Sequence, residues 1–456
     1  MNKLDQNILR FIDEKKLIKI GDKILVALSG GPDSVFLLYF LIKYKQRFKI
    51  DLGIIHINHM LRSKEALLDE KFCRALANDY RIPFHSYRKN IKLFSKKNKI
   101  SIEEAGRIIR YSYFDIAAGK FNYTKIATAH NCNDNTETVF LNLIKGTGLR
   151  GISGIPAQRG NIIRPILNTA KEDILKFLKM NDIQFRIDKS NLENDYERNF
   201  LRNEILPLLT AKLNPSLNKS IFNSSELFKD VYSFVLNRLE NEYKPVSKFK
   251  DGRLFIDINS FLNIERGVRT EYIKLQVEKN FLIQLSLNDL KKIISLNEND
   301  PGEKVELSQN FAAIRDRKEI VIYRIKKTNV PNQAKLKSES ESLDDHLNKT
   351  ISIKELRTVP EKYSKNKKIE YISGDNISGQ LTVRKWRNGD RFFPLGLKGS
   401  KKVSDFLTDQ KISPLYKKDQ LVLTDNENII WVVGLRIDNR FKIKKNTEKV
   451  LELCLK

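Results

Sequence analysis

The sequence predicts an α/β fold with a parallel sheet in its first domain, then a helical middle domain and a small α+β domain. Two observations carry this prediction. Short apolar runs alternate with longer segments of helical periodicity over the first two hundred residues, as in βαβ units. The later segments lose this alternation. Because βαβ units cover a sheet from both sides, we expect helices on both faces of the first sheet.

The expected elements of the first domain follow one another in a regular order. Strands are expected at 24–28, 52–57, 84–87 and 125–129, with an edge strand at 162–166. Helices are expected at 35–44, 64–80, 102–119 and 134–145. Ser101 is expected to cap the third helix, with Glu104 completing a capping box.

The rest of the chain divides by composition. From about 203 to 296 the segments are helical with few glycines, and 305–325 has the pattern of β structure. A polar stretch follows, and strands and turns dominate after residue 369. We therefore expect four parts, which are an α/β domain, a mainly helical middle domain, a linker region and a C-terminal domain at 1–205, 206–330, 331–368 and 369–456.

Charge and cysteine content narrow the classes of function. The 456 residues carry a formal net charge of +27, which is typical of proteins that bind a polyanion such as nucleic acid. An A·T-rich genome, which enriches lysine everywhere, is the alternative explanation for part of that charge. The three cysteines have no CxxC spacing, which argues against a disulfide framework, a zinc site and an iron–sulfur cluster.

Targeting signals are not expected. The N-terminal segment is amphipathic and contains acids, unlike a signal or transit peptide. No apolar run approaches the roughly 20 residues that span a membrane. We expect a cytoplasmic protein without a membrane partner.

A glycine-containing loop between the first strand and the first helix is the strongest motif. It reads Ser29-Gly30-Gly31-Pro32-Asp33-Ser34. A helix N-terminus after such a turn offers free backbone N–H groups and a positive dipole end to phosphate, and glycines allow close approach. The loop contains no lysine, so it is not the GxxxxGK[ST] type. A plain turn with a Ser/Asp helix cap is the alternative reading.

A second glycine pattern, GTGLRG at 146–151, fits GxGxxG by its letters. It follows an expected helix and not a strand, which is the wrong context for dinucleotide binding. We interpret it as the end of a helix and a loop.

Five further segments, taken in order, point to one family. The SGGPDS loop resembles the pyrophosphate loop of N-type ATP pyrophosphatases, which adenylate a substrate oxygen. The other segments resemble tRNA(Ile)-lysidine synthetase and begin with IIHINHMLR, EEAGRIIRYSYF, ATAHNCNDNTET, DKSNLENDYERN and WRNGDRFFPLG, at 54–62, 103–114, 127–155, 188–209 and 386–414.

The resemblance implies a specific reaction. Using ATP and Mg²⁺, such an enzyme adenylates O2 of the wobble cytidine in an isoleucine tRNA with a CAU anticodon. The ε-amine of L-lysine then attacks C2, which releases AMP after pyrophosphate and switches the codon read from AUG to AUA. An amine must lose a proton before it attacks, which calls for nearby carboxylates. No protein partner is implied.

The resemblance also assigns candidate site residues. His130 and Arg107 would contact the phosphates, and Asp33, Asp134 and Glu137 would hold Mg²⁺ or orient the lysine amine, with Asp33 and Asp134 as metal ligands. His130, Asp134 and Glu137 share one face if their helix begins early. The alternatives are acids that favour a helix N-terminus and a buried histidine.

One departure from the family pattern concerns Asn133, which stands where the family has an acid next to Asp134. No role that needs two adjacent charges is therefore expected at this point.

Basic residues outside the loop are candidates for substrate and tRNA. Arg198 and Arg202 share a helix face and suit phosphate or the carboxylate of lysine, or they form a solvated basic face. In the C-terminal block, Arg384, Arg387 and Arg391 lie among aromatic residues that could stack on bases. A small β domain with an aromatic core and a charged rim is the alternative.

Three rival functions remain. A tRNA-thiolating enzyme with the same loop is disfavoured by the cysteine spacing. A small-molecule amide ligase leaves the charge and the C-terminal block unexplained. A non-catalytic RNA-binding protein is disfavoured by the intact set of candidate residues.

Overall fold

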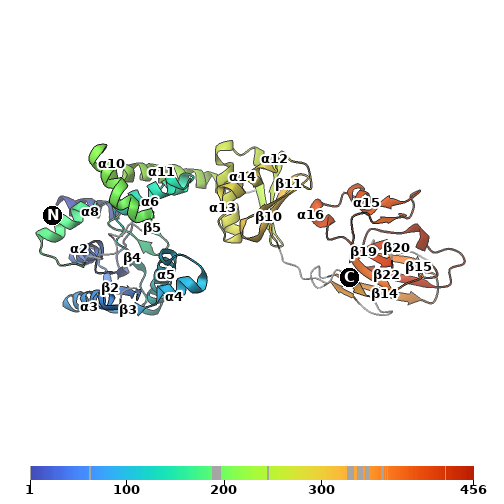
Figure 1. Cartoon of the computed structure of the whole chain (residues 1–456), viewed down its shortest axis with the longest axis horizontal. Helices are drawn as coiled ribbons and strands as arrows, with labels where there is room; N and C mark the ends of the chain where they lie inside the picture. The colour runs from blue at the N-terminus through green and yellow to red at the C-terminus, as the bar shows by residue number, and fades with distance from the viewer. Residues whose placement is uncertain are drawn as a thin grey trace. The chain divides into compact units, whose positions relative to one another are not determined.

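The structure is a computed structural model whose helices and strands are labelled in Figure 1. It divides into two compact units, Met1–Asn237 and Arg238–Lys456. The structure describes the whole chain apart from residues 1, 61–62, 187–196, 244–245, 326–332, 336–341, 345–348, 361–363, 365, 367, 427 and 456.

A six-stranded sheet with the order β3-β2-β1-β4-β6-β5 forms the centre of the N-terminal unit. In that order, the strands are Phe84–Arg88, Asp51–Asn58, Lys23–Ala27, Lys125–Ala127, Ile162–Ile163 and Gln158–Arg159. All neighbours pair in parallel except β5 and β6. The expected parallel sheet is therefore confirmed.

The expected edge strand at 162–166 needs correction. Only Ile162 and Ile163 form β6, and β6 lies inside the sheet because β5 pairs with its free side. The hairpin between them turns at Gly160, whose φ of +60° suits a residue without a side chain. A two-residue strand followed by a glycine turn is too short to be recognised from its pattern alone.

Helices cover both faces of this sheet, as expected. Alternate residues of β1 point to opposite faces, so Ile24 and Val26 pack in one apolar core while Leu25 packs in another with Phe114. The helices of this unit are Lys3–Glu14 (α1), Pro32–Phe48 (α2), Ser63–Asp79 (α3), Ile91–Asn98 (α4), Ile102–Phe121 (α5), Cys132–Ile144 (α6), Leu149–Ile152 (α7), Lys171–Met180 (α8), Glu197–Phe200 (α9), Leu206–Lys212 (α10) and Leu217–Asn241 (α11).

Helix termini in this unit follow the sequence signals. Ser101 caps α5 as expected, because its Oγ accepts a hydrogen bond from the backbone N–H of Glu104 at 3.1 Å. The expected capping box is not completed, because among the described residues the Glu104 side chain forms no bond to the Ser101 N–H. After α6 the chain turns at Gly146, whose φ is +73°, and α7 follows. The first half of GTGLRG, Gly146–Gly148, is therefore the expected helix end and loop, whereas Leu149, Arg150 and Gly151 begin the short helix α7, which was not expected.

The middle of the chain contains more β structure than expected. A five-stranded antiparallel sheet with the order β7-β8-β11-β10-β9 consists of Ser247–Lys250, Arg253–Asp257, Glu319–Arg324, Phe311–Asp316 and Lys304–Leu307. The last three confirm the β pattern at 305–325, but β7 and β8 interrupt the range expected to be helical. Both are short, and the pairing of β8 with β11 stabilises them in a way that local pattern does not reveal. The accompanying helices α12, α13 and α14 span Ile258–Leu262, Arg269–Phe281 and Leu287–Ser295.

Two sheets form the last part of the chain. One has the order β12-β16-β19-β20-β21, with strands Gln333–Lys335, Leu381–Lys385, Leu421–Asp425, Asn428–Val432 and Arg436–Ile437. The other has the order β13-β14-β22-β15, with strands Ser342–Asp344, Lys349–Leu356, Val450–Leu455 and Ile369–Ser373. Leu423 and Trp431 of the first share an apolar core with Ile351 and Leu453 of the second.

Short elements complete this part and modify the expected boundaries. They are the strand pair Arg391–Phe392 (β17) with Lys401–Lys402 (β18), and the helices Val403–Asp409 (α15) and Pro414–Lys417 (α16). β14 lies within the range expected to be a linker, yet it pairs with β22 along six residues, from Ile351–Leu455 to Leu356–Val450. The pairing of strands about a hundred residues apart in sequence makes this segment part of the fold.

Candidate functional site

The carboxyl ends of β1 and β4 form the structural frame of the candidate site. These strands are neighbours, and the strand order reverses between them, since β2 and β3 continue on one side and β6 on the other. In open α/β sheets, ligands bind outside the carboxyl ends of the strands at such a reversal. The loop 28–31 follows β1 and the segment 128–131 follows β4, so both predicted motifs lie at this edge.

The loop Ser29–Ser34 is shaped by its own hydroxyl groups. The buried Ser34 Oγ donates to the Gly31 carbonyl at 2.9 Å and accepts from the Ser29 N–H at 3.2 Å. Gly30 has φ +92°, a conformation that side chains strain. Gly31 is the N-cap of α2 without a side-chain cap, and Pro32 is the first helical residue. The helix N-terminus is therefore left to a ligand, while Ser34 maintains the loop.

Asn131 holds two of the predicted acids in place, and sequence reasoning missed it. Its Nδ2 donates to Asp33 Oδ1 at 2.9 Å. Asn131 and Asp134 also form a reciprocal capping box at the start of α6, with both bonds at 3.0 Å. Only 2% of Asn131 is exposed. Asn131 thus holds both carboxylates, that of Asp33 through its side chain and that of Asp134 through its backbone N–H. The N-cap position of Asn131 was the available signal.

The electrostatics of Asp33 reflect this crowding. Burial, and next the negative charge of Asp134, raise the pKa of Asp33 above its ordinary value. The charges of Lys171 and Arg202 and the hydrogen bond from Asn131 act in the opposite direction. A cation bound by Asp33 and Asp134 could offset the repulsion between the two carboxylates.

Glu137 is paired with both arginines of the following helical segment. Its carboxylate, 2% exposed, accepts from Arg198 Nε at 2.8 Å and from Arg202 Nε and Nη2 at 2.6 and 2.8 Å. Arg202 Nη2 also donates to Asp134 Oδ1 at 3.3 Å. Arg202 lies in a short π-helix, Leu201–Ile205, of a kind that often occurs at functional sites. The two arginines share a face, as expected, and that face meets the acids.

His130 is neutral and lies before the helix. Its Nδ1 is 3.0 Å from Thr128 Oγ1. Burial, and next the charges of Arg164, Arg110, Arg198 and Arg107, lower the pKa of His130 to about 3. α6 begins at Cys132, so the early helix start that would put His130 on one face with Asp134 and Glu137 is wrong. The extended backbone of the N-cap residue separates them.

Arg107 lies on the exposed side of α5, with its guanidinium 5.9 Å from the centre of the Tyr111 ring. Its charge contributes to the lowered pKa of His130, which brings this predicted pair together. Arg110 and Arg164 act on His130 more strongly, and sequence reasoning missed both. Arg110 is one helical turn after Arg107, and Arg164 directly follows β6, so spacing and strand-end position were the available signals.

Asn133 has a structural role. Its Oδ1 accepts from the Lys171 N–H at 3.0 Å and its Nδ2 donates to Glu172 Oε1 at 3.3 Å. It thereby connects α6 with the first turn of α8. A carboxylate at this position could not donate to Glu172, so the departure from the family pattern fits its surroundings.

The cysteines are in environments that disfavour thiolate chemistry. Burial is the main cause that raises the pKa of Cys73 and of Cys132 to about 12. Cys132 donates to the Asn218 carbonyl at 3.1 Å. Within the described ranges, no group of three or more His, Cys, Asp and Glu side chains is arranged to hold a metal ion.

In the C-terminal unit, the three predicted arginines have different surroundings. Arg384, 9% exposed, forms two bonds to Asp390, at 2.7 and 3.0 Å. Arg391 is exposed and bonds to Ser400 Oγ, and the side chain of Arg387 is exposed. Arg384 is therefore committed to the fold, whereas Arg387 and Arg391 face solvent.

The aromatic residues of this block are mostly core. Phe392 is fully buried, and Trp386 donates its Nε1 to the Lys417 carbonyl at 2.5 Å. Phe393 is more exposed and lies beneath Arg440, whose guanidinium is 4.8 Å from the ring centre. Base stacking by all three, as the interleaved pattern suggested, does not fit; only Phe393 among them presents a ring near the surface.

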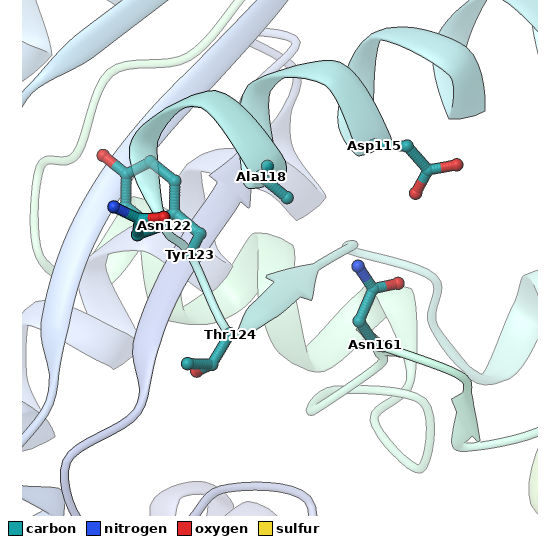
Figure 2. Close-up of a pocket in the computed structure, with 7 residues that line it drawn as sticks. Asp115, Ala118, Asn122, Tyr123, Thr124 and Asn161 are labelled. Carbon is teal, nitrogen blue, oxygen red and sulfur yellow. The ribbon is translucent and has the colours of Figure 1, made fainter.

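An open, shallow cavity of the N-terminal unit lies away from these residues. It has a volume of about 530 Å³, and Figure 2 shows Asp115, Tyr123, Thr124 and Asn161 around it. Thr124 precedes β4, so this cavity lies at the amino end of the strand, opposite the loop. No described helix is both long enough and apolar enough to pass through a bilayer.

Comparison with known proteins supports the family resemblance found in the sequence. Residues 1–209 match the family model described as PP-loop domain, and 381–453 match the TilS substrate C-terminal domain. The tRNA(Ile)-lysidine synthase of Caldanaerobacter subterraneus subsp. tengcongensis is 30% identical over 450 residues, 98% of this chain and 96% of that protein. That of Parabacteroides distasonis is 34% identical over 442 residues, 97% of each.

Among solved structures, the U34-tRNA thiolase NcsA from Methanococcus maripaludis with its [4Fe-4S] cluster covers 50% of this chain and 80% of its own. The identity is 17% and the TM-score 0.42. A TILS C-terminal domain covers 27% of this chain and 95% of its own, at 21% identity and a TM-score of 0.25. These likenesses are too low to bear on the activity.

Proposed function

The chain belongs to the tRNA(Ile)-lysidine synthase family, and from that premise we propose how its own residues carry out the reaction. The enzyme is a ligase that uses ATP to join lysine to a cytidine of tRNA(Ile). One observation carries the proposal for the site: Asp33 and Asp134, which come from different strand ends, are both held by Asn131 beside the phosphate loop. A cytoplasmic location remains a prediction.

The loop and the two acids would receive Mg²⁺–ATP. The N-terminus of α2 has no side-chain cap, and its N–H groups would bind phosphate oxygens. Asp33 and Asp134 would hold Mg²⁺, an ion that one or two carboxylates and substrate phosphates commonly bind. The ion would neutralise charge on the phosphates. It would also relieve the repulsion that raises the pKa of Asp33.

In the first step, O2 of the wobble cytidine attacks the α-phosphorus of ATP, and the bond to the β-phosphate oxygen breaks. The departing pyrophosphate carries negative charge, which Arg107 would stabilise. His130, neutral because burial and arginines lower its pKa to about 3, would donate a hydrogen bond and not add a charge. C2 of the base then carries an AMP leaving group.

In the second step, Glu137 and Asp134 would receive the lysine side chain. In the structure, Arg198 and Arg202 are hydrogen-bonded to the Glu137 carboxylate, so this carboxylate can pair with cationic nitrogen atoms at 2.6–2.8 Å. An incoming ammonium would bind there and lose its proton to a carboxylate or to water, because only the neutral amine can attack C2. Displaced from Glu137, Arg202 would be free to bind the α-carboxylate of lysine.

The C-terminal unit would bind the tRNA body. Arg387 and Arg391 face solvent and would contact phosphates, with Phe393 beside them. The net charge of +27 supports a polyanionic partner. Arg384 is not included, because its guanidinium is bonded to Asp390.

The proposal is tested with labelled lysine, Mg²⁺–ATP and a tRNA(Ile) transcript with a CAU anticodon. We expect label in this tRNA, release of AMP, and no label in a methionine tRNA with the same anticodon. Asp33→Ala should lower the rate by about 10³-fold or more. Asp13→Ala, which changes an exposed acid paired with Arg47, is the matched control. AMP formation without tRNA, or transfer by Asp33→Ala at the wild-type rate, would contradict the proposal.

A further inference from the structure

Arg164 is a buried cation that directly follows β6, at the carboxyl end of the strand. Only 4% of the residue is exposed. Its Nη1 donates to the Pro156 carbonyl at 2.7 Å, and its side chain also bonds to Tyr111, but its buried Nε has no hydrogen-bond partner. Buried guanidinium groups normally have every donor satisfied. An unpartnered N–H on a buried charge indicates a missing acceptor.

The strand pairing places Arg164 beside His130. β4 and β6 pair in parallel, with Ala127 next to Ile163, and the Thr128 N–H donates to the Ile163 carbonyl at 3.0 Å. Arg164 follows this pair at once, and His130 follows Thr128 by two residues. Both side chains therefore originate at the carboxyl edge of the sheet, where ligands bind.

α5 contributes two more arginines to the same place. Arg107 and Arg110 are three residues apart and share a helix face. Tyr111, which bonds to Arg164, lies 5.9 Å from the Arg107 guanidinium. We call Arg107, Arg110 and Arg164 the arginine cluster.

No carboxylate of the described residues forms an ion pair with the arginine cluster. Glu103, at the start of α5, acts on Arg110 only through its charge. A second unpartnered atom lies nearby: His59 Nδ1 is buried without a hydrogen bond, and burial and the charge of Arg110 hold the pKa of His59 near 4. Three cations without an acid and two buried nitrogen atoms without partners converge on one edge.

We propose that the arginine cluster is a second phosphate-binding site, separate from the loop, in which Arg110 and Arg164 bind phosphate oxygens directly. Guanidinium groups bind phosphate in a bidentate manner, and the buried Arg164 favours a small, enclosed anion such as the terminal phosphates of ATP. A phosphodiester next to the target cytidine has the same chemistry. The inference rests on the proposed function only in naming these two sources of phosphate.

The experiment measures binding without turnover, so that it does not depend on lysine transfer. Binding of Mg²⁺–pyrophosphate and of a non-hydrolysable ATP analogue is measured by calorimetry. Binding of tRNA(Ile) is measured at several salt concentrations. The variants are Arg110→Gln and Arg164→Lys, and the control is Arg47→Gln, an exposed arginine near the opposite end of α2.

We expect Arg110→Gln and Arg164→Lys to weaken phosphate binding about tenfold or more, while Arg47→Gln has no effect. Weaker binding of pyrophosphate and the ATP analogue identifies ATP as the source. Weaker tRNA binding with a salt slope reduced by about one identifies the phosphodiester. Because Arg110 is exposed, its variant decides the matter if Arg164→Lys does not fold. Unchanged affinity for all three ligands in a folded Arg110→Gln protein overturns the proposal.

A failure of this inference differs from a failure of the proposed function. If lysine transfer is absent but phosphate ligands bind and respond to Arg110→Gln, the arginine cluster stands and the assigned reaction falls. If lysine transfer proceeds but Arg110→Gln leaves phosphate binding unchanged, the assigned reaction stands and the inference about the arginine cluster falls.

Discussion

The two sides of the candidate site contain the same kind of side chain in opposite electrostatic states. On the acidic side, Arg198 and Arg202 are bonded to Glu137 at 2.6–2.8 Å. On the other side, the arginine cluster has no described carboxylate in an ion pair and contains a buried N–H without an acceptor. Both lie at the carboxyl edge of one sheet in the N-terminal unit.

This difference indicates which substrate group each side receives. A carboxylate already paired with cations suits another cation, and the lysine ammonium would exchange with the arginines. An uncompensated group of cations suits an anion, whose binding restores the missing acceptors. In the proposed reaction, the acids would receive the amine of one substrate and the arginine cluster the phosphates of the other.

Among the variants that test this comparison, Glu137→Gln should change the free energy of unfolding most. Glutamine keeps the shape but removes the charge on which Arg198 and Arg202 depend, and breaking such a buried pair lowers the free energy of unfolding by about 3 kcal/mol. Urea denaturation measures it. Glu242→Gln, at an exposed carboxylate paired with Arg238, is the control, and we expect little change there. A loss below about 1 kcal/mol at Glu137 would mean that the acidic side is held by packing.

Arg384 extends the comparison to the C-terminal unit, where a buried arginine has an acid and an exposed one does not. Arg384→Ala should lower the free energy of unfolding by about 2–3 kcal/mol, because Asp390 is left without its two bonds. Arg387→Ala should leave stability unchanged and weaken tRNA binding in low salt. Thermal unfolding and filter binding distinguish them. If Arg387→Ala lowered stability and Arg384→Ala weakened only tRNA binding, burial and pairing with Asp390 would not determine which arginine binds RNA.

His130 should make stability depend on pH. The folded pKa of about 3 lies below the ordinary value of 6.5, so between these values the unfolded chain binds a proton that the folded chain does not. The contribution is present above pH 6.5 and is lost as the pH falls toward 3, which amounts to about 2 kcal/mol at pH 5. His130→Asn should therefore lose less stability than wild type between pH 7.5 and 5. Parallel pH profiles for the two proteins would refute a neutral, buried His130.

Arg164→Met should have a smaller effect on stability than Glu137→Gln, Arg384→Ala or the titration of His130. Arg164 forms no ion pair with a carboxylate of the described residues, so its replacement leaves no buried acid unpaired. We expect the free energy of unfolding to fall by about 1 kcal/mol, from the lost bonds to Pro156 and Tyr111. Chemical denaturation without ligands measures this. A loss as large as that of Glu137→Gln would show that the arginine cluster has a structural partner and would remove the contrast between the two sides.

Local signals were sufficient for much of the fold and for the loop. The strand, the glycine turn and the helix around Ser29–Ser34 are adjacent in sequence, so backbone preference and apolar pattern identify them together. The five-stranded sheet was only partly found, because β7 and β8 are short, and β8, on which β7 pairs, is itself stabilised by β11, sixty to seventy residues later in the chain. The same reason applies to β14 and β22.

The site shows a similar division at the level of single residues. Asp33, Asp134 and Glu137 could be chosen from motifs, but Asn131 could not, since its value lies in bridging Asp33 and the start of α6 across 98 residues. Arg198, Arg202 and Arg384 were chosen as ligands for anions, and the structure bonds all three to carboxylates. Arg110 and Arg164 were passed over, although no carboxylate in the described part of the chain forms an ion pair with either of them.

The sequence by itself determined the class of fold, the phosphate loop, the family and the types of residue at the site, because each depends on neighbours along the chain. Only the tertiary structure decided which charges are compensated. Ion pairing depends on distances of a few ångströms between residues far apart in sequence, and the free energy of a buried charge depends on its surroundings. Only the three-dimensional structure therefore shows that Glu137 is paired with two arginines, whereas Arg164 forms no ion pair with a carboxylate of the described residues.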